Sequence, residues 1–208
     1  MPSSADGGRA WSALAVVLAL GALAAFFAHA NGAIDWQPAL ALREPWRALS
    51  AALVHYSALH LAANLAGTAL VGALGRVARV PARSAAAWLA AWPLTQLGLL
   101  AEPELRHFGG LSGVLHAGTA CVAWHLIVHA HGPRRAIGAL LLAVLAVKVI
   151  SESPWGPALR HPAGWDIATA PAAHASGLVA GLLCAALADA TVALRRRRST
   201  AKTVRGTP

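Results

Sequence analysis

Residues 170–194 read APAAHASGLVAGLLCAALADATVAL, and the basic run Arg195-Arg196-Arg197-Arg198 follows directly. A helix needs about 20 consecutive, mostly apolar residues to cross the hydrocarbon core of a bilayer. Basic residues gather where such a helix leaves the membrane on the cytoplasmic side. The stretch therefore predicts a membrane-spanning helix that ends at a membrane surface.

Five further apolar runs lie near residues 11–30, 47–74, 84–101, 111–130 and 135–151. Of the 208 residues, 57% are hydrophobic and only 12% are charged, which leaves little polar surface for a soluble domain. We therefore expect an all-α membrane protein, with one six-helix domain over residues 1–194 and a basic cytoplasmic tail over residues 195–208.

The first apolar run could instead be a cleaved signal peptide. Arg9 precedes it, and Ala28-His29-Ala30 resembles a cleavage site. Because the run is long for a signal peptide and five more spans follow it, we interpret it as the first span.

The charges of the loops orient the expected bundle. Basic residues lie on one side of it, namely Arg9, Arg76, Arg79, Arg83, Arg134, Arg135 and the terminal run. The positive-inside rule makes that side cytoplasmic and places both termini inside. Much of the formal charge of +9 lies in the tail, so it does not indicate nucleic-acid binding. A solvated stop-transfer tail is our main interpretation, and an anionic-lipid site is the alternative.

Tryptophan, cysteine and histidine residues outside the motifs receive structural interpretations. Trp11, Trp88 and Trp92, near the inner helix ends, are interpreted as interfacial anchors. We expect the two cysteines, Cys121 and Cys184, to be small packing residues rather than halves of a disulfide. His125 and His129 share a helix face that could bind a metal, but no HExxH motif or carboxylate joins them. We expect neither a cofactor nor a metal.

Polar residues inside a bilayer are costly, so they tend to face the bundle interior and to have a function. Four stand out: His60 and Asn64 in the second span, Ser112 at the start of the fourth and His174 early in the sixth. Lys148, near the outer end of the fifth span, is interpreted as a side chain that extends to the membrane interface.

Ser112 lies within the segment Gly109-Gly110-Leu111-Ser112-Gly113, where a loop is expected to become a helix. Glycines allow close backbone approach, and amides at a helix N-terminus are free to bind an oxyanion. The alternative is a serine that merely caps the helix.

His174, Gly177 and Gly181 share one helix face, because the glycines follow the histidine by three and seven residues. The two glycines form a small-xxx-small pair, which lets helix backbones meet and can bring His174 against Ser112. The alternative is a buried histidine that hydrogen-bonds a backbone carbonyl.

His60 and Asn64 are four residues apart and therefore point in one direction, where they can stabilise an oxyanion or simply join two helices. With Ser112 and His174 they supply a nucleophile, a base and oxyanion donors on three spans. We expect a Ser-His dyad without an acidic third member, because an ionised carboxylate in hydrocarbon is costly. The one acidic residue near His174 in the sequence, Asp166, belongs to an outer loop.

The ordered motifs of residues 46–181 resemble those of the rhomboid family of intramembrane serine proteases. They are Trp46-Arg47 in the first outer loop; His55, His60 and Asn64 in the second span; Gly110-Leu111-Ser112-Gly113 in the fourth; and Ala173-His174 with Gly177 and Gly181 in the sixth. The resemblance implies a six-transmembrane-helix rhomboid-like bundle in which Ser112 attacks a carbonyl and His174 transfers the proton. It further implies that Asn64, His60 and the Ser112 amide hold the oxyanion, and that the loop of residues 31–47 lies beside the active site.

The short length and the runs HLAANLAG and GLSGVLHAG look like the rhombosortase subgroup of Gram-negative bacteria, although Ala175 departs from its usual larger aliphatic residue. The subgroup implies a multi-pass enzyme of the bacterial inner membrane whose active site opens to the periplasm. Its substrates are membrane-anchored proteins with a C-terminal tail of a Gly-Gly motif, a hydrophobic helix and a basic cluster. The alternatives are a general rhomboid protease, a non-catalytic rhomboid-like protein that binds membrane helices, and a small transporter with proton-carrying histidines. The sequence indicates no particular oligomeric state.

Overall fold

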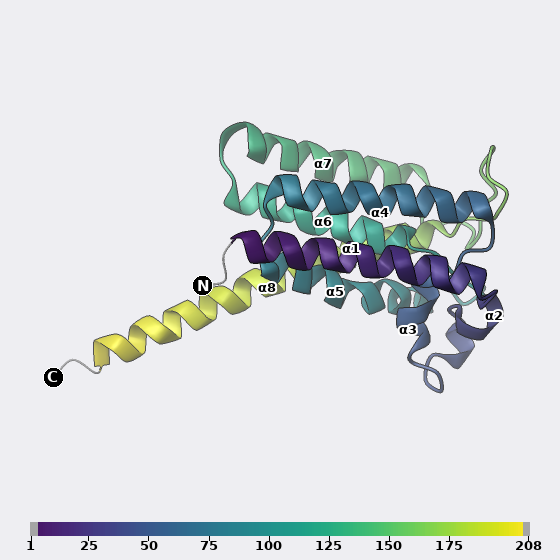
Figure 1. The fold of residues 1–208 in the computed structure, drawn as a ribbon, viewed down its shortest axis with the longest axis horizontal. Helices are drawn as coiled ribbons and strands as arrows, with labels where there is room; N and C mark the ends of the chain where they lie inside the picture. The colour runs from purple at the N-terminus through teal and green to yellow at the C-terminus, as the bar shows by residue number, and fades with distance from the viewer. Residues whose placement is uncertain (1–3, 206–208) are drawn as a thin grey trace.

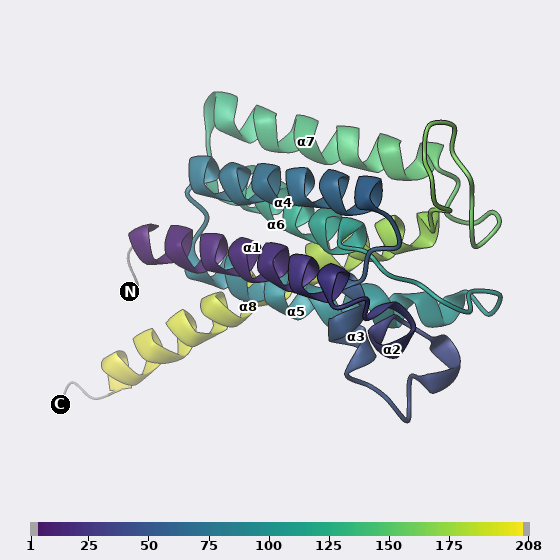
Figure 2. The ribbon, with the colours of Figure 1, turned by 45° about the vertical axis from the view of Figure 1, so that its right-hand side comes forward.

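The computed structural model describes residues 4–205, with side chains described for residues 7–195. Six long helices pack into one bundle (Figures 1 and 2). They are α1 (Ser4–Phe27), α4 (Ala58–Ala78), α5 (Ala82–Leu97), α6 (Ser112–His129), α7 (Gly132–Ser151) and α8 (Pro171–Arg205). The described residues contain no named strand, and the predicted all-α, six-helix membrane bundle is confirmed.

Three of these helices are long and apolar enough, by length and composition, to cross a membrane. These candidate spans are Gly7–Phe27, Ala58–Ala78 and Pro171–Arg195. The other three are less apolar or shorter, since α5 has 16 residues and α7 carries Arg134, Arg135 and Lys148. They nevertheless belong to the same bundle, because α6 packs against α4, α5, α7 and α8.

The second apolar run is not one helix, and the expected continuous span over residues 47–74 is wrong. The short helices α3 (Arg47–Ser50) and η2 (Ala51–Leu53) precede an irregular turn, and α4 begins only at Ala58. Ser57 ends this turn as the N-cap of α4, where its hydroxyl accepts a hydrogen bond from the His60 amide at 3.0 Å. The cap fixes the start of the helix that carries His60 and Asn64.

The remaining short elements lie in the loop after α1 and at the end of α5. They are α2 (Asn31–Ile34), η1 (Pro38–Leu40) and η3 (Gly98–Ala101). The start of α1 and the last turns of α8 lie at one end of the molecule, and α2 and α3 lie at the other (Figure 1). The side chains after Arg195 lie outside the described residues, as do residues 206–208, so the predicted basic tail is described only by its backbone as far as Arg205.

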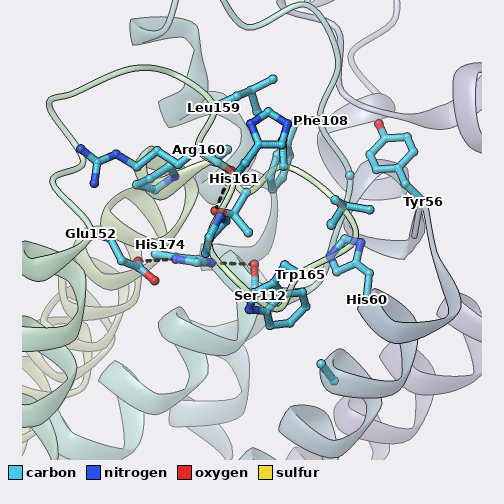
Figure 3. Close-up of a pocket in the computed structure, with 18 of the residues that line it drawn as sticks. Tyr56, His60, Phe108, Ser112, Glu152, Leu159, Arg160, His161, Trp165 and His174 are labelled. Atoms are coloured by element: carbon cyan, nitrogen blue, oxygen red, sulfur yellow. Dashed lines mark hydrogen bonds and ion pairs between the residues drawn. The ribbon is translucent and has the colours of Figure 1, made fainter.

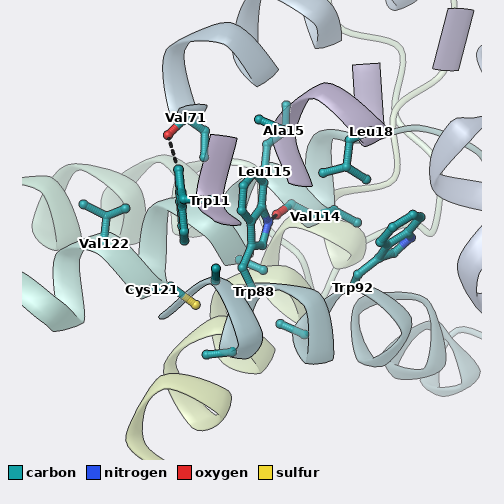
Figure 4. Packing of buried hydrophobic residues seen from close by; sticks show 14 of the residues in the cluster. Trp11, Ala15, Leu18, Val71, Trp88, Trp92, Val114, Leu115, Cys121 and Val122 are labelled. Carbon is teal, nitrogen blue, oxygen red and sulfur yellow. Dashed lines mark hydrogen bonds between the residues drawn. The ribbon is translucent and has the colours of Figure 1, made fainter. Parts of the chain in front are cut away.

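Two tryptophans fill the space between α1, α5 and α6. Trp11 and Trp88 are fully buried, with ring centroids 4.4 Å apart (Figure 4). The indole N–H of Trp88 donates to the Val114 carbonyl at 2.8 Å, and that of Trp11 donates to the Val71 carbonyl at 2.9 Å. The interpretation of Trp11, Trp88 and the likewise buried Trp92 as interfacial anchors is therefore wrong. Buried indoles need a partner for the N–H, and backbone carbonyls inside the bundle supply it.

Glycines bring α6 and α8 into direct backbone contact. A Cβ atom on Gly177 would overlap the carbonyl oxygen of Gly113, and one on Gly181 would overlap that of Ala117. The predicted close approach of the two helices is confirmed. Because His174 lies one turn before Gly177, the same contact holds its side chain against the start of α6.

We predict that Gly177→Ala lowers the free energy of unfolding by about 2 kcal/mol, because the added methyl group must push two backbones apart. Thermal unfolding of the protein in detergent measures this change. Gly8→Ala in α1 is the matched control, since a Cβ there meets no atom within 4 Å. Equal melting temperatures for the two variants would contradict the proposed role of the helix contact.

Candidate functional site

Ser112 and His174 face each other across the α6–α8 contact. Ser112 is the first residue of α6, and His174 lies in the first turn of α8. The Ser112 hydroxyl oxygen is 2.9 Å from Nε2 of His174 (Figure 3). The expected hydrogen-bond contact between the two side chains is therefore present, in the geometry that a serine nucleophile and its base require.

A carboxylate lies behind His174, and the expectation that no acidic residue would stand there is wrong. Oε2 of Glu152 is 2.6 Å from Nδ1 of His174, on the ring edge opposite Ser112 (Figure 3). Glu152 directly follows α7 and keeps 31% of its side chain exposed, which avoids the cost of a fully buried charge. Glu152 precedes His174 by 22 positions in the sequence, so sequence proximity could not reveal this contact.

Lys148 points into this site rather than to the membrane interface, so its interpretation as an interfacial side chain is wrong. Its Nζ lies 3.0 Å from Oε1 of Glu152, one helical turn away, and 2.7 Å from Nε2 of His116. Burial raises the pKa of Glu152, but hydrogen bonds and electrostatic interactions with His174 and Lys148 outweigh burial and lower the pKa to about 2. Glu152 is therefore ionised at neutral pH.

His116 forms a second contact surface for the His174 ring. The two imidazoles are stacked, with centroids 4.3 Å apart and an interplanar angle of 12°. Nδ1 of His116 lies 2.6 Å from the Ser112 carbonyl oxygen, one turn earlier in α6. The stack and this hydrogen bond restrict rotation of His174 beside Ser112.

His60 and Asn64 of α4 face the glycine turn before Ser112. Gly110 has a φ of 136°, a conformation that favours glycine, and a Cβ there would lie 2.8 Å from Nε2 of His60 and 3.8 Å from Nδ2 of Asn64. His55 packs behind His60, with ring centroids 4.7 Å apart, and its Nδ1 bonds the Leu53 carbonyl at 3.0 Å. Because Gly110 has no side chain, His60 and Asn64 can lie close to the backbone just before α6.

These residues line one cavity of about 930 Å³. It is bounded by α4, α6, α7, α8 and the loop of residues 152–170, and its polar lining includes His60, Asn64, Ser112, His116, Lys148, Glu152, Arg160, His161 and His174. Figure 3 shows Arg160, His161 and Trp165 of this loop around the serine and histidine.

Asp35 connects the loop of residues 31–47 to the segment before Ser112. It is almost fully buried, and its Oδ2 accepts from Tyr56 at 3.0 Å and lies 2.8 Å from Nδ1 of His107. Burial, followed by the Asp35 charge, raises the pKa of the Tyr56 hydroxyl, which keeps it a hydrogen-bond donor. Trp36 and Phe108 add a pair of backbone hydrogen bonds of 2.7 and 2.9 Å. The sequence interpretation missed Asp35, because its partners come from separate segments.

The two residues of the Trp46-Arg47 motif differ in exposure to solvent. Trp46 is exposed, whereas Arg47 is buried and donates to the Asp35 carbonyl at 2.8 Å and to the Asp35 carboxylate at 3.3 Å. Its Nε also pairs with Glu44. Arg47 therefore holds the folded loop together, and neither residue of the motif lines the cavity.

The described residues offer no group of three His, Cys, Asp or Glu side chains that could hold a metal ion. The rings of His125 and His129 are 5.4 Å apart, and His129 pairs with Asp189 at 2.6 Å. Cys121 and Cys184 are both free and buried, as expected for packing residues.

The fold and the cavity define an all-helical membrane protein with a serine and a histidine held together inside the bundle. The family model of the Rhomboid domain matches residues 42–190, which cover most of the chain and every residue that lines the cavity. The chain therefore belongs to the rhomboid family, whose members are typically intramembrane serine proteases that act on membrane proteins. Among curated proteins, no match to the chain is found.

We predict that Arg47→Ala lowers the free energy of unfolding by about 3 kcal/mol, because it leaves the buried Asp35 charge without its cation. The exposed Arg43 of the same loop is the matched control, and Arg43→Ala should change stability by less than about 0.5 kcal/mol. Chemical or thermal unfolding in detergent gives both values. A loss of stability that is the same for both variants would refute the role assigned to the Arg47–Asp35 pair.

Proposed function

We propose that this chain is an intramembrane serine endopeptidase in which Ser112 is the nucleophile and His174 the base. The single observation that carries the proposal is the 2.9 Å contact between Oγ of Ser112 and Nε2 of His174, inside a cavity of a rhomboid-family bundle. A serine that only capped α6 would need no imidazole at its hydroxyl, and a buried histidine held by a carbonyl would not face a serine.

The reaction follows from this contact. Oγ of Ser112 attacks the carbonyl carbon of a substrate peptide bond, and its proton moves to Nε2 of His174. The tetrahedral intermediate collapses as His174 returns the proton to the leaving amine, and the acyl group stays on Ser112. A water molecule from the cavity then gives a proton to His174 and attacks the acyl carbon. As the second intermediate collapses, His174 returns that proton to Oγ of Ser112 and the acid product is released. The described lining of the cavity includes enough polar side chains to keep water near Ser112.

His60, Asn64 and the amide of Ser112 are proposed to stabilise the oxyanion. The amides of the first helical turn have no partner within the helix, so the Ser112 amide is free for this role. The positions of His60 and Asn64 beside Gly110 support it, because Gly110 is two residues before Ser112 and both side chains line the same cavity as Ser112. Donors fixed before the reaction stabilise the developing charge without reorganisation.

The substrates are proposed to be membrane-anchored proteins with a C-terminal tail of a Gly-Gly motif, a hydrophobic helix and a basic cluster, as in rhombosortases. The sequence runs around Asn64 and Ser112 support this subgroup. We further propose that the chain lies in a bacterial inner membrane, with residues 195–208 as a cytoplasmic tail and the cavity open to the periplasm. The positive loops at one end of the bundle support this orientation.

The test of the proposed function is co-expression of the chain with a reporter that ends in such a tripartite tail. We expect the intact chain to process the reporter and Ser112→Ala to leave it uncleaved. Thr119→Val is the matched control, because this hydroxyl of α6 bonds only the Leu115 carbonyl of its own helix. Processing that survives in Ser112→Ala would overturn the protease assignment.

A second reporter, with a single span and no Gly-Gly motif, separates the two protease hypotheses. Cleavage of only the tripartite tail supports the rhombosortase subgroup, whereas cleavage of both reporters indicates a general rhomboid protease. If neither reporter is cleaved by the intact chain, and both bind to it, the non-catalytic alternative is favoured over our proposal.

We predict that Asn64→Ala lowers kcat by about 10²-fold and changes KM little, because an oxyanion donor acts mainly in the transition state. The matched control is Gln96→Leu, which removes a buried carboxamide of α5 that does not line the cavity. Steady-state cleavage by purified protein in detergent or proteoliposomes gives both constants. Equal kcat values for the two variants would remove Asn64 from the proposed oxyanion site.

A further inference from the structure

We propose that Glu152, paired with Lys148, is a positioning residue that fixes the tautomer and orientation of His174. This inference rests on the proposed function, since it assigns a role in the reaction of Ser112 and His174. It adds a carboxylate from the end of α7 to a pair that comes from α6 and α8. The site then has three members in a line: Ser112, His174 and Glu152 (Figure 3).

The two nitrogens of His174 have different partners. Nε2 lies 2.9 Å from the Ser112 hydroxyl, and Nδ1 lies 2.6 Å from Oε2 of Glu152. To accept the proton of Ser112, Nε2 must be unprotonated, so the neutral ring carries its proton on Nδ1. The only acceptor in this contact is the Glu152 carboxylate. Glu152 therefore selects the tautomer that leaves Nε2 ready to act as a base.

The neighbouring hydrogen bonds agree with this tautomer. Nζ of Lys148 lies 3.0 Å from Nδ1 of His174, but a protonated Nδ1 cannot accept from an ammonium group. Lys148 therefore donates to Oε1 of Glu152 at 3.0 Å and to Nε2 of His116 at 2.7 Å. His116 is then protonated on Nδ1 and donates to the Ser112 carbonyl at 2.6 Å. One assignment of protons satisfies all four side chains.

The Lys148–Glu152 pair also balances charge at the site. The ion pair is neutral as a whole, so it adds little net charge to the cavity. When His174 becomes an imidazolium ion during the reaction, the Glu152 charge 2.6 Å away stabilises it directly. The Lys148 cation opposes this effect, and it also holds Glu152 in place through the i, i+4 contact on α7.

The other titratable groups around His174 come from each element that surrounds the cavity. They are His116 on α6, His60 on α4, Tyr56 and His107 in the segments before α4 and α6, and Arg160, His161 and Asp166 in the loop of residues 152–170. None of these has a recorded contact with Nδ1 of His174, which among the described side chains meets Glu152 and Lys148. The pH dependence of the reaction should therefore respond most strongly to these two residues.

The test is the pH profile of kcat/KM for the full-length chain with the tripartite-tail reporter. In Glu152→Gln the imidazolium loses its anionic partner and keeps the Lys148 cation, so His174 protonates only at lower pH. We expect the acid limb of the profile to move to lower pH and kcat to fall by about 10²-fold or more. In Lys148→Met a repelling cation is lost, so the acid limb should move to higher pH.

Two further variants separate positioning from structure. Glu152→Asp restores the carboxylate and should return the acid limb toward that of the intact chain, with part of the lost kcat. Glu104→Gln makes the same charge change at an exposed carboxylate of the loop before α6. It should leave both the acid limb of the pH profile and kcat unchanged. Melting temperatures in detergent show whether each variant is folded under the assay conditions.

The outcomes distinguish the inference from the proposed function. If Ser112→Ala is inactive while Glu152→Gln keeps the rate and pH profile of the intact chain, Glu152 has no positioning role and the protease assignment stands. If Glu152→Gln loses stability with an unshifted profile, its role is structural and the inference is wrong. If Ser112→Ala is as active as the intact chain, the proposed function fails first.

Discussion

The direct contact between the backbones of α6 and α8 is the constraint on which the site depends. Gly177 and Gly181 leave no side chain between the helices, so the carbonyls of Gly113 and Ala117 occupy that space. A wider separation would carry the first turn of α8 away from the start of α6. The 2.9 Å contact between Ser112 and His174 is thus a consequence of helix packing rather than of a flexible loop. Small residues at a helix crossing are the usual means of such close approach in membranes.

Satisfaction of polar groups is the second constraint, because an unpaired charge in a membrane bundle is costly. The structure meets it with paired side chains. Lys148 and Glu152 form an ion pair at the end of α7, and Asp35 accepts from Arg47 and Tyr56 beneath the loop of residues 31–47. Lys148 and Glu152 line the cavity directly, whereas the Asp35 network reaches it through Tyr56 and His107. Each therefore links a loop to the helices that carry the proposed reacting groups.

The sequence was sufficient to predict the membrane bundle, the family and the contact between Ser112 and His174. These depend on local signals: apolar runs, glycines next to a serine, and glycines three and seven residues after a histidine. Glu152 was not predicted, because it precedes His174 by 22 positions and most of the residues between them form a loop whose course has no local signal. The available clue was that Lys148 and Glu152 are one helical turn apart and can form an ion pair. The carboxylate of such a pair at a helix end can also accept a hydrogen bond from a third residue.

Other misses have the same physical origin. Trp11 and Trp88 are of the residue type that is typical of interfacial anchors. They are nevertheless buried, because the backbone carbonyls of Val71 and Val114 accept hydrogen bonds from their indole N–H groups. The break before α4 was missed because the apolar run continues through it, and its signal is the single cap at Ser57. In each case a tertiary or capping hydrogen bond determines the position of a residue or a helix end that hydrophobicity alone does not specify.

The most direct test of the central claim is the reactivity of Ser112 itself. A phosphonofluoridate is attacked by an activated serine oxygen, which displaces fluoride and leaves a phosphonyl group of known mass on that residue. Mass spectrometry of the purified, folded protein should find this group on Ser112, and His174→Ala should remove most of the labelling. Equal labelling of Ser112 in the intact protein and in His174→Ala would contradict the account, because the histidine would then not activate the serine.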